Sequence, residues 1–364
     1  MKKALKLINN KIGIGLFCCL FFLLLGCKGT SSKETVQENV TVQVQDAVLN
    51  TEEQEKETDY EIQYPMIVTD QIGRQVTIEE EPQTIVSGYY ISTSLLIALG
   101  QEEKMVGIEN NPEIRPIYEK SAPHLLELPQ VGTVKELDLE QCALLQPDLM
   151  VLPFKLKDTA DSLEQLGITV LYVKPESKEL LDETISLLGQ VLNIKERASL
   201  LQSAIATKEK EMAELVEGCQ KPTVYLTGNS NFLTTAGKEM YQHSLVEMAG
   251  GKNVAEELTG FSWSEISYEQ LLAWDPEYIV LAANAKFDVE SVLKDENLAA
   301  CQAVKNGNVY QFPNDIESWD SPVPGSVLGG LWLASILHPE CYDSSCYEAS
   351  VEEFYQEFYD INMQ

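Results

Sequence analysis

The sequence has 364 residues, of which 57 are acidic and 26 are lysine or arginine, and its formal net charge is −31. A surface this acidic repels phosphate backbones and anionic lipid headgroups, so the composition argues against a nucleic-acid-binding protein. The length is sufficient for two lobes of ordinary domain size, each with its own hydrophobic core.

Residues 1–26 have the pattern of a secretory signal. Four lysines precede an apolar run over residues 12–25, which is shorter than the ~20 residues that a membrane-spanning helix needs. The run ends in Gly26-Cys27, which resembles the lipobox of bacterial lipoproteins. We therefore expect cleavage before Cys27, acylation of its thiol, and attachment to the outer face of the cytoplasmic membrane through the lipid alone. An uncleaved anchor helix is the alternative, and it would also hold the chain outside the cytoplasm.

The next segment, residues 27–63, is polar. It is rich in Glu, Gln, Thr and Ser and offers little apolar surface to bury. Such a composition predicts an acylated cysteine followed by a disordered tether.

A repeated pattern gives the remaining chain its organisation. Residues 139–152 and 268–281 carry Glu, Gln and Pro at matching positions, and each copy is typical of a short helix stopped by proline and followed by a buried strand. Other apolar strand-like runs alternate with helical stretches, as in parallel sheets. The sequence therefore predicts an α/β fold with two similar lobes of mostly parallel sheet, over residues 64–178 and 219–364.

Helical spacing of apolar residues marks the segment between the lobes, residues 179–218. Its second part, residues 195–216, would form a helix of about 33 Å. We expect a single long inter-lobe helix that permits only modest lobe closure. The ligand cleft is expected between the lobes, because ligands of open α/β sheets collect at the carboxyl ends of the strands.

From residue 68 onward, the chain resembles the class III solute-binding proteins of ABC importers, which handle iron–siderophore complexes, vitamin B12 and haem. The resemblance rests on the order of short motifs at residues 70–74, 84–87, 145–151, 163–168, 237–239, 249–253 and 267–270. It implies an extracytoplasmic, monomeric binding protein with no catalytic residues and no resident cofactor. Its expected partners are a permease dimer with cytoplasmic ATPases and a small metal chelate.

The same resemblance gives the repeated glutamates a role. Glu140 and Glu269 occupy equivalent positions in the two copies of the repeat and match the paired surface acids with which the family docks on permease arginines. Two separated charge pairs would set the register on a two-fold symmetric partner. The alternative is that each is a solvated acid in the first turn of a helix.

Loops that follow the predicted strands supply the candidate ligand-binding residues. Trp263 and Trp319 resemble, by position, pocket aromatics of the vitamin B12-binding members, and the polar context of Trp319 favours exposure. Of the adjacent Tyr89 and Tyr90, one is expected to point inward. Arg115 is the only arginine in a candidate cleft loop.

Three arginines in the whole chain are few for a highly anionic siderophore, which favours a neutral or weakly charged macrocycle such as a corrinoid. Haem, with a tyrosine as axial ligand, and ferric siderophores remain open. A bare metal ion is disfavoured because His124, His243 and His338 are widely spaced, so no metal ligands are predicted.

Two other classes of function compete with solute binding. No nucleophile elbow, zinc-protease or nucleotide-binding motif occurs, but the many acids leave room for a lipid-anchored two-carboxylate hydrolase that uses the same cleft. An adhesin or structural lipoprotein would lack a deep inter-lobe cleft. The cysteines carry no catalytic signal; Cys142 is expected in the core, and Cys341 and Cys346 are close enough in sequence to close a small loop.

Overall fold

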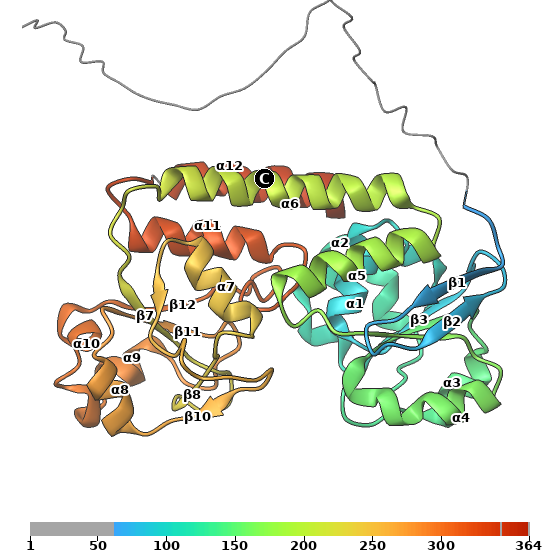
Figure 1. Ribbon diagram of the computed structural model, residues 1–364, viewed down its shortest axis with the longest axis horizontal. Coiled ribbons are helices and arrows are strands. Elements are labelled where there is room, and N and C mark those ends of the chain that lie inside the picture. The colour runs from blue at the N-terminus through green and yellow to red at the C-terminus, as the bar shows by residue number, and fades with distance from the viewer. Residues whose placement is uncertain (1–61, 343, 363–364) are drawn as a thin grey trace, which may run out of the picture. The chain divides into compact units, whose positions relative to one another are not determined.

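The computed structural model describes residues 62–342 and 344–362, with only the backbone of residues 344–346. Two four-stranded parallel sheets organise this part of the chain (Figure 1), as predicted. The first has the strand order β4-β3-β5-β6 and the second the order β12-β11-β7-β9. Their strands are β3 (Ile85–Ser87), β4 (Met105–Gly107), β5 (Leu149–Pro153), β6 (Val170–Val173), β7 (Thr223–Leu226), β9 (Lys252–Asn253), β11 (Tyr278–Leu281) and β12 (Val309–Gln311).

Both sheets are covered by helices, and their central strands are buried on both faces. Every residue of β5 is buried, as are the last three of β11, as expected for parallel sheets with helical crossovers. The helices of the first lobe are α1 (Tyr90–Ala98), α2 (Pro116–Ser121), α3 (Leu139–Leu145), α4 (Ala160–Gln165) and α5 (Lys178–Val191). Those of the second lobe are α7 (Tyr241–Met248), α8 (Tyr268–Trp274), α9 (Val289–Leu293), α10 (Gln302–Asn306) and α11 (Ser326–Leu337).

Two small antiparallel pairs flank the lobes, β1 (Met66–Thr69) with β2 (Gln75–Ile78), and β8 (Thr234–Thr235) with β10 (Ser264–Glu265). The turn between β1 and β2 is fixed by Asp70, which is buried and accepts hydrogen bonds from the Arg74 backbone N–H at 2.9 Å and its Nε at 3.0 Å. Arg74 also donates to the Val170 carbonyl in β6 at 2.7 Å. The Asp-Gln-Ile-Gly-Arg motif therefore attaches this hairpin to the first sheet.

The sequence repeat is also a structural repeat. Side chains of Asp138 and Ser267 cap α3 and α8 in the same way, each accepting from the backbone N–H three residues later. Both helices end on a residue with left-handed backbone, Gln146 at φ 43° and Asp275 at φ 42°. A proline follows in each case, and then β5 or β11. The predicted helix–proline–strand pattern is thus present in both lobes.

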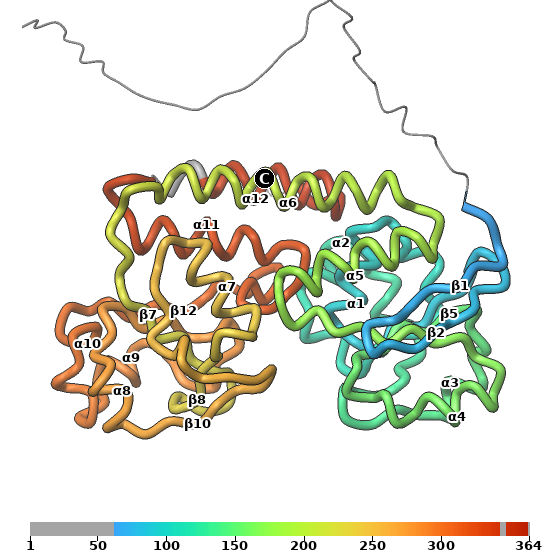
Figure 2. Tube along the Cα trace, viewed as in Figure 1, coloured from blue at the N-terminus to red at the C-terminus, as the bar shows by residue number. Residues whose placement is uncertain are grey.

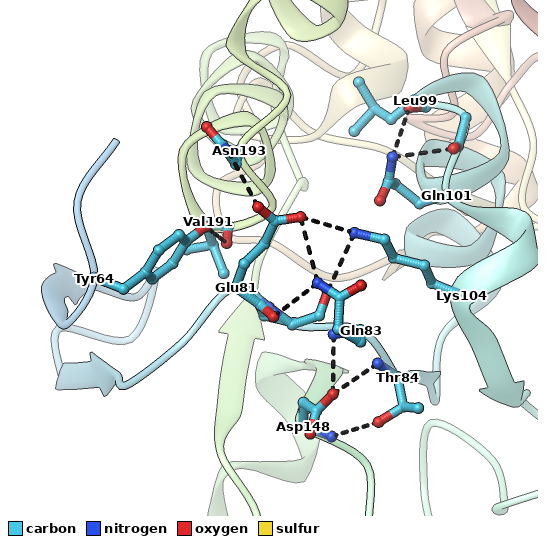
Figure 3. A network of polar contacts seen from close by, with 12 residues as sticks. Tyr64, Glu81, Gln83, Thr84, Leu99, Gln101, Lys104, Asp148, Val191 and Asn193 are labelled. Carbon is cyan, nitrogen blue, oxygen red and sulfur yellow. Dashed lines mark hydrogen bonds and ion pairs between the residues drawn. The ribbon is translucent and has the colours of Figure 1, made fainter. Parts of the chain in front are cut away.

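The acid after each proline fixes the start of the strands. Asp148 accepts from the backbone N–H of Thr84 at 2.8 Å, and its own N–H donates to Thr84 Oγ1 at 3.0 Å (Figure 3). In the second lobe, Glu277 and Thr223 exchange the corresponding bonds at 2.8 and 3.0 Å. Burial opposes ionisation of Asp148, but the backbone donors of Gln83 and Thr84 outweigh it and lower the pKa of the carboxyl group.

The inter-lobe helix is α6 (Lys195–Leu215), which packs on α5 at one end and on α11 at the other. A second helix, α12 (Ser344–Tyr359), runs along α6, where Lys208 forms an ion pair with Glu353 at 3.1 Å, and reaches back to α1 of the first lobe (Figures 1 and 2). The sequence predicted a single helical connection, and α12 adds a second, non-covalent one. Arg197 of α6 contacts both α1 and α12. It donates to the carbonyls of Ala98 and Glu357, and its guanidinium carbon lies 4.8 Å from the centre of the Phe358 ring.

Within residues 62–342 and 344–362, no helix combines the length and the apolar character that crossing a bilayer requires. Cys27 and the predicted signal and tether lie outside the described residues, apart from the last two tether positions.

Candidate functional site

A cavity of about 350 Å³ opens between the two lobes, at loops that follow the parallel strands. The first lobe contributes the start of α1 and the loop after β4, and the second lobe contributes the loops after β11 and β12. Its polar lining comprises Tyr90, Ser94, Arg115 and Tyr118 from the first lobe, and Asn284, Asn314, Asp315, Glu317 and Ser318 from the second. This is the region where the sequence predicted the ligand cleft.

Two of the predicted ligand-binding residues meet in this cavity. The Arg115 guanidinium carbon lies 4.1 Å from the centre of the Tyr90 ring, in a cation–π contact. The Tyr90 hydroxyl in turn donates to Ser321 Oγ of the second lobe at 3.1 Å. In the part of the chain that the structure describes, no carboxylate forms an ion pair with Arg115. The ring therefore orients the guanidinium without neutralising its charge.

The opposite wall carries neutral hydrogen-bonding groups beside the acids Asp315 and Glu317. Asn284 Nδ2 donates to Ser318 Oγ at 2.6 Å, and Asn314 Nδ2 donates to the Ala283 carbonyl at 3.0 Å. These bonds hold the amides in place where they line the cavity. The sequence did not single out Asn284, Ser318 or Asn314 as candidate ligand-binding residues. The position of Asn314 just after β12 was the signal that could have indicated it.

The other predicted aromatic residues do not line this cavity. Tyr89 is buried and packs edge-to-face on Tyr90 with ring centres 5.3 Å apart, so it is the inward member of the pair. Trp263 is half-buried beside Gly228 in the second lobe, where a Cβ on that glycine would lie 3.1 Å from the indole. It packs against the core, and a ligand contact for Tyr89 or Trp263 stays a prediction.

The predicted exposure of Trp319 is wrong. Its side chain is 5% exposed, and its indole N–H donates to the Tyr355 hydroxyl of α12 at 2.8 Å. The backbone of α11 approaches it closely at Gly329, where a Cβ would lie 2.7 Å from the Trp319 Cβ. Trp319 therefore belongs to the packing of α11 and α12. The Gly329-Gly330 pair within a helix was the available signal, since it permits such close approach.

A rim of aromatic and cationic side chains lies beside the loops after β5 and β6. Lys174 Nζ is 3.6 Å from the ring centre of Phe261, which belongs to the second lobe, and 5.4 Å from that of Phe154. Lys155 lies 3.9 Å from Glu176, whose pKa is raised by burial and lowered in part by the two lysines. We call Phe154, Lys155, Lys174 and Phe261 the cationic–aromatic rim.

Buried carboxyl groups support the cavity from behind. Glu109 accepts from Thr93 Oγ1 at 2.7 Å and from the Tyr118 hydroxyl at 2.6 Å, and Glu317 accepts from the hydroxyls of Ser94, Tyr355 and Tyr359. Burial raises the pKa of both groups, and the hydroxyl donors offset part of that rise. Hydrogen bonds from hydroxyl groups of α1, α2 and α12 thus hold both acids in place behind the cavity.

Comparison with known proteins decides the family. The profile of the periplasmic binding protein family matches residues 85–316, which is more than half of the chain. The chain belongs to this family of ABC-transporter solute-binding proteins. Members bind solutes and do not turn them over, so the hydrolase alternative falls away. The protein is the extracytoplasmic solute-binding component of an importer, and a permease is implied as its partner.

Individual relatives match between about half and four fifths of the chain. The molybdate-binding protein MolA of Haemophilus influenzae is 25% identical over 80% of this chain and 90% of its own. The ABC transporter substrate-binding lipoprotein YvrC of Bacillus subtilis is 25% identical over 77% of this chain and 87% of its own. The vitamin B12-binding protein of Salmonella typhi is 32% identical over 48% of this chain and 67% of its own. A periplasmic solute-binding protein of Veillonella parvula superimposes with a TM-score of 0.70 at 26% identity, covering 82% and 94%.

Asp320 gives the stability of this region a testable pH dependence. The side chain is buried, its Oδ1 has no hydrogen-bond partner among the described residues, and burial raises the pKa of the carboxyl group to about 6. Because the folded state then binds the proton more tightly than the unfolded chain, stability is highest when Asp320 is protonated and falls as pH rises from about 4 through about 6.

We expect Asp320→Asn to remove this loss. The free energy of unfolding of the variant minus that of the wild type should grow by about 2.4 kcal/mol between pH 4 and pH 8. Urea denaturation at several pH values measures it, with Asp315→Asn, an exposed neighbour, as the control. A difference that stays constant with pH would contradict the raised pKa of the buried Asp320 carboxyl group.

Proposed function

We propose that the protein captures a compact anionic, metal-containing solute in the cavity between Arg115 and the second-lobe amides. The observation that carries this proposal is the Arg115 guanidinium, held against Tyr90 at 4.1 Å with no ion-pair partner in the described part of the chain. A guanidinium free of carboxylates binds oxyanions through paired N–H donors. The second N–H of the Asn284 amide and the Ser318 hydroxyl add neutral donors on the facing wall, where Asn314 holds the Asn284 side chain at 3.3 Å.

The size of the cavity and the similarity to MolA both favour a metal oxyanion as the solute. A volume of about 350 Å³ lies near the lower end of the range for small-molecule sites, roughly 300–1,000 Å³. It suits a compact solute better than a whole macrocycle. The relative MolA, which matches along most of its length, is a molybdate-binding protein. A tetrahedral oxyanion such as molybdate is therefore the first candidate.

A larger metal chelate is the second candidate, and the cationic–aromatic rim favours it. Phe154 and Phe261 with Lys155 and Lys174 present flat rings and positive charge where the two lobes meet. Such a surface suits a corrinoid, a haem or a ferric siderophore. An anionic group at one edge of that ligand would bind Arg115. The vitamin B12-binding relatives support this alternative over about half of the chain.

A binding screen tests both candidates. We expect molybdate or tungstate to raise the melting temperature of the purified chain, because a ligand at 100 times its Kd adds about 2.7 kcal/mol to stability. Arg115→Gln should abolish the shift, whereas Lys120→Gln, a nearby exposed residue, should preserve it. Stabilisation only by cobalamin, cobinamide, haem or ferric siderophores would replace the first candidate by the second. No stabilisation by any of them, or an unchanged affinity in Arg115→Gln, would refute the proposed site.

Docking on the permease is assigned to Glu140 and Glu269. Both are exposed at the second position of equivalent helices, α3 and α8, which lie at the edge of Figure 1 opposite α6 and α12. The Ser267 side chain and the backbone N–H of Glu269 lower the pKa of the Glu269 carboxyl group, so it stays charged. Equivalent charges on two lobes suit arginines on the two halves of a permease dimer.

The double substitution Glu140→Gln with Glu269→Gln should reduce uptake at least about tenfold and leave ligand affinity unchanged, since two interfacial charge pairs are lost but the cavity is not touched. Uptake of labelled ligand into cells and calorimetry on the purified chain measure the two effects. Glu119→Gln with Glu257→Gln, also one exposed acid on each lobe, is the charge-matched control. An equal loss of uptake in that control, or a loss of affinity in the test variant, would argue against docking.

Lipid attachment is assigned to Cys27, which lies outside the described residues. The apolar run and Gly26-Cys27 support it, and the relative YvrC is a lipoprotein. Replacing Cys27 by serine should move the protein from the membrane fraction to the soluble fraction, because the acyl chains alone anchor it. Immunoblots of fractionated cells measure this. Retention of the serine variant in the membrane would instead favour an uncleaved anchor helix.

A further inference from the structure

Two cysteines that are 122 residues apart in sequence lie side by side in the second lobe. The Sγ atoms of Cys219 and Cys341 are 2.9 Å apart. Cys219 is half-buried and lies in the segment between α6 and β7, and Cys341 is exposed between α11 and α12. The packing of α11 against α6 brings these two segments together.

Backbone turns hold both cysteines at this meeting point. The N–H of Cys219 donates to the Val216 carbonyl at 3.1 Å, after the last turn of α6, and the N–H of Cys341 donates to the His338 carbonyl at 2.9 Å, after the last turn of α11. Gly218, at φ 78°, reverses the chain just before Cys219. The two thiols are therefore placed by regular helix endings and not by a mobile loop.

The other described cysteine side chains are not available for pairing. Cys142 is buried in a hydrophobic cluster of the first lobe and Cys301 in one of the second. Cys346 has no described side chain. Of the four free thiols that the structure describes, only Cys219 and Cys341 lie within reach of each other.

We infer that Cys219 and Cys341 form a disulfide bond in the exported protein. The protein works outside the cytoplasm, where disulfides form and persist. The two thiols would be oxidised by a disulfide reagent or a thiol–disulfide oxidoreductase: one Sγ–Sγ bond forms, the S–S bond of the oxidant breaks, and the oxidant leaves as two thiols that carry both protons.

The bond would enclose almost the whole second lobe in one covalent loop. All strands from β7 to β12 and helices α7 to α11 lie between Cys219 and Cys341. Closing so long a loop restricts the unfolded chain, which is the main way in which disulfides stabilise proteins. It also fixes the end of the inter-lobe helix α6 to the α11–α12 connection, at the point where the chain enters the second lobe.

Peptide mapping is the direct test. The full chain is expressed with export, solubilised from membranes in detergent, treated with N-ethylmaleimide and digested without reduction. We expect a cross-linked peptide pair that contains Cys219 and Cys341 and is two hydrogen atoms lighter than its parts. Alkylation of both residues, also after incubation with oxidised glutathione, would overturn the inference. So would a linkage between Cys341 and Cys346, the pair that the sequence brings close together.

Thermal unfolding supplies an independent readout. Dithiothreitol should lower the melting temperature of the oxidised wild type by about 5 °C. Cys341→Ser, at an exposed position, should have the lower melting temperature from the start and no response to dithiothreitol. Cys346→Ser is the matched control and should respond like the wild type. Loss of the response in Cys346→Ser instead of Cys341→Ser would contradict the inferred pairing.

Discussion

The buried carboxylate of Glu317 joins the parts of the structure on which the cavity depends. It follows β12 in the second lobe, and it accepts hydrogen bonds from Ser94 in α1 of the first lobe and from Tyr355 and Tyr359 in α12. The Glu317 side chain lies against the backbone of residue 325, which must be glycine because a Cβ there would lie 2.4 Å from Glu317 Oε2. A buried acid with three hydroxyl donors is stable only while all of its partners stay in place, because an unpaired buried acid is costly.

This constraint bears on how the lobes move. Besides Glu317, the first and second lobes are joined by the Tyr90–Ser321 hydrogen bond, by Lys174 on Phe261 and by α12, which runs along α6. Opening the lobes widely would expose several buried polar groups at once, so the structure favours small adjustments around a largely preformed cavity. A preformed site loses little conformational entropy on binding, and its affinity therefore depends on the match between solute and lining.

Local features of the sequence were sufficient to predict the two sheets and the repeat. The caps at Asp138 and Ser267, the prolines and the buried strands act within a few residues of one another, so their pattern is readable without tertiary information. The burial of Trp319 and the position of α12 were not readable in this way. They depend on contacts such as Ser94 with Tyr359, which are 265 residues apart. Cys219 and Cys341 were missed for the same reason, because sequence proximity suggested Cys346 as the partner of Cys341.

The three arginines of the chain show how an acidic protein keeps a cationic site. Arg74 forms ion pairs with Asp70 and Glu164, and Arg197 donates its hydrogen bonds to backbone carbonyls. Arg115 instead rests on the Tyr90 ring, while the nearby buried acids Glu109 and Glu317 are held by hydroxyl groups. Of the described residues that line the cavity, only Arg115 is cationic. Because the acids bind hydroxyl groups and leave the guanidinium unpaired, its charge remains available to a solute even though the protein as a whole repels anions.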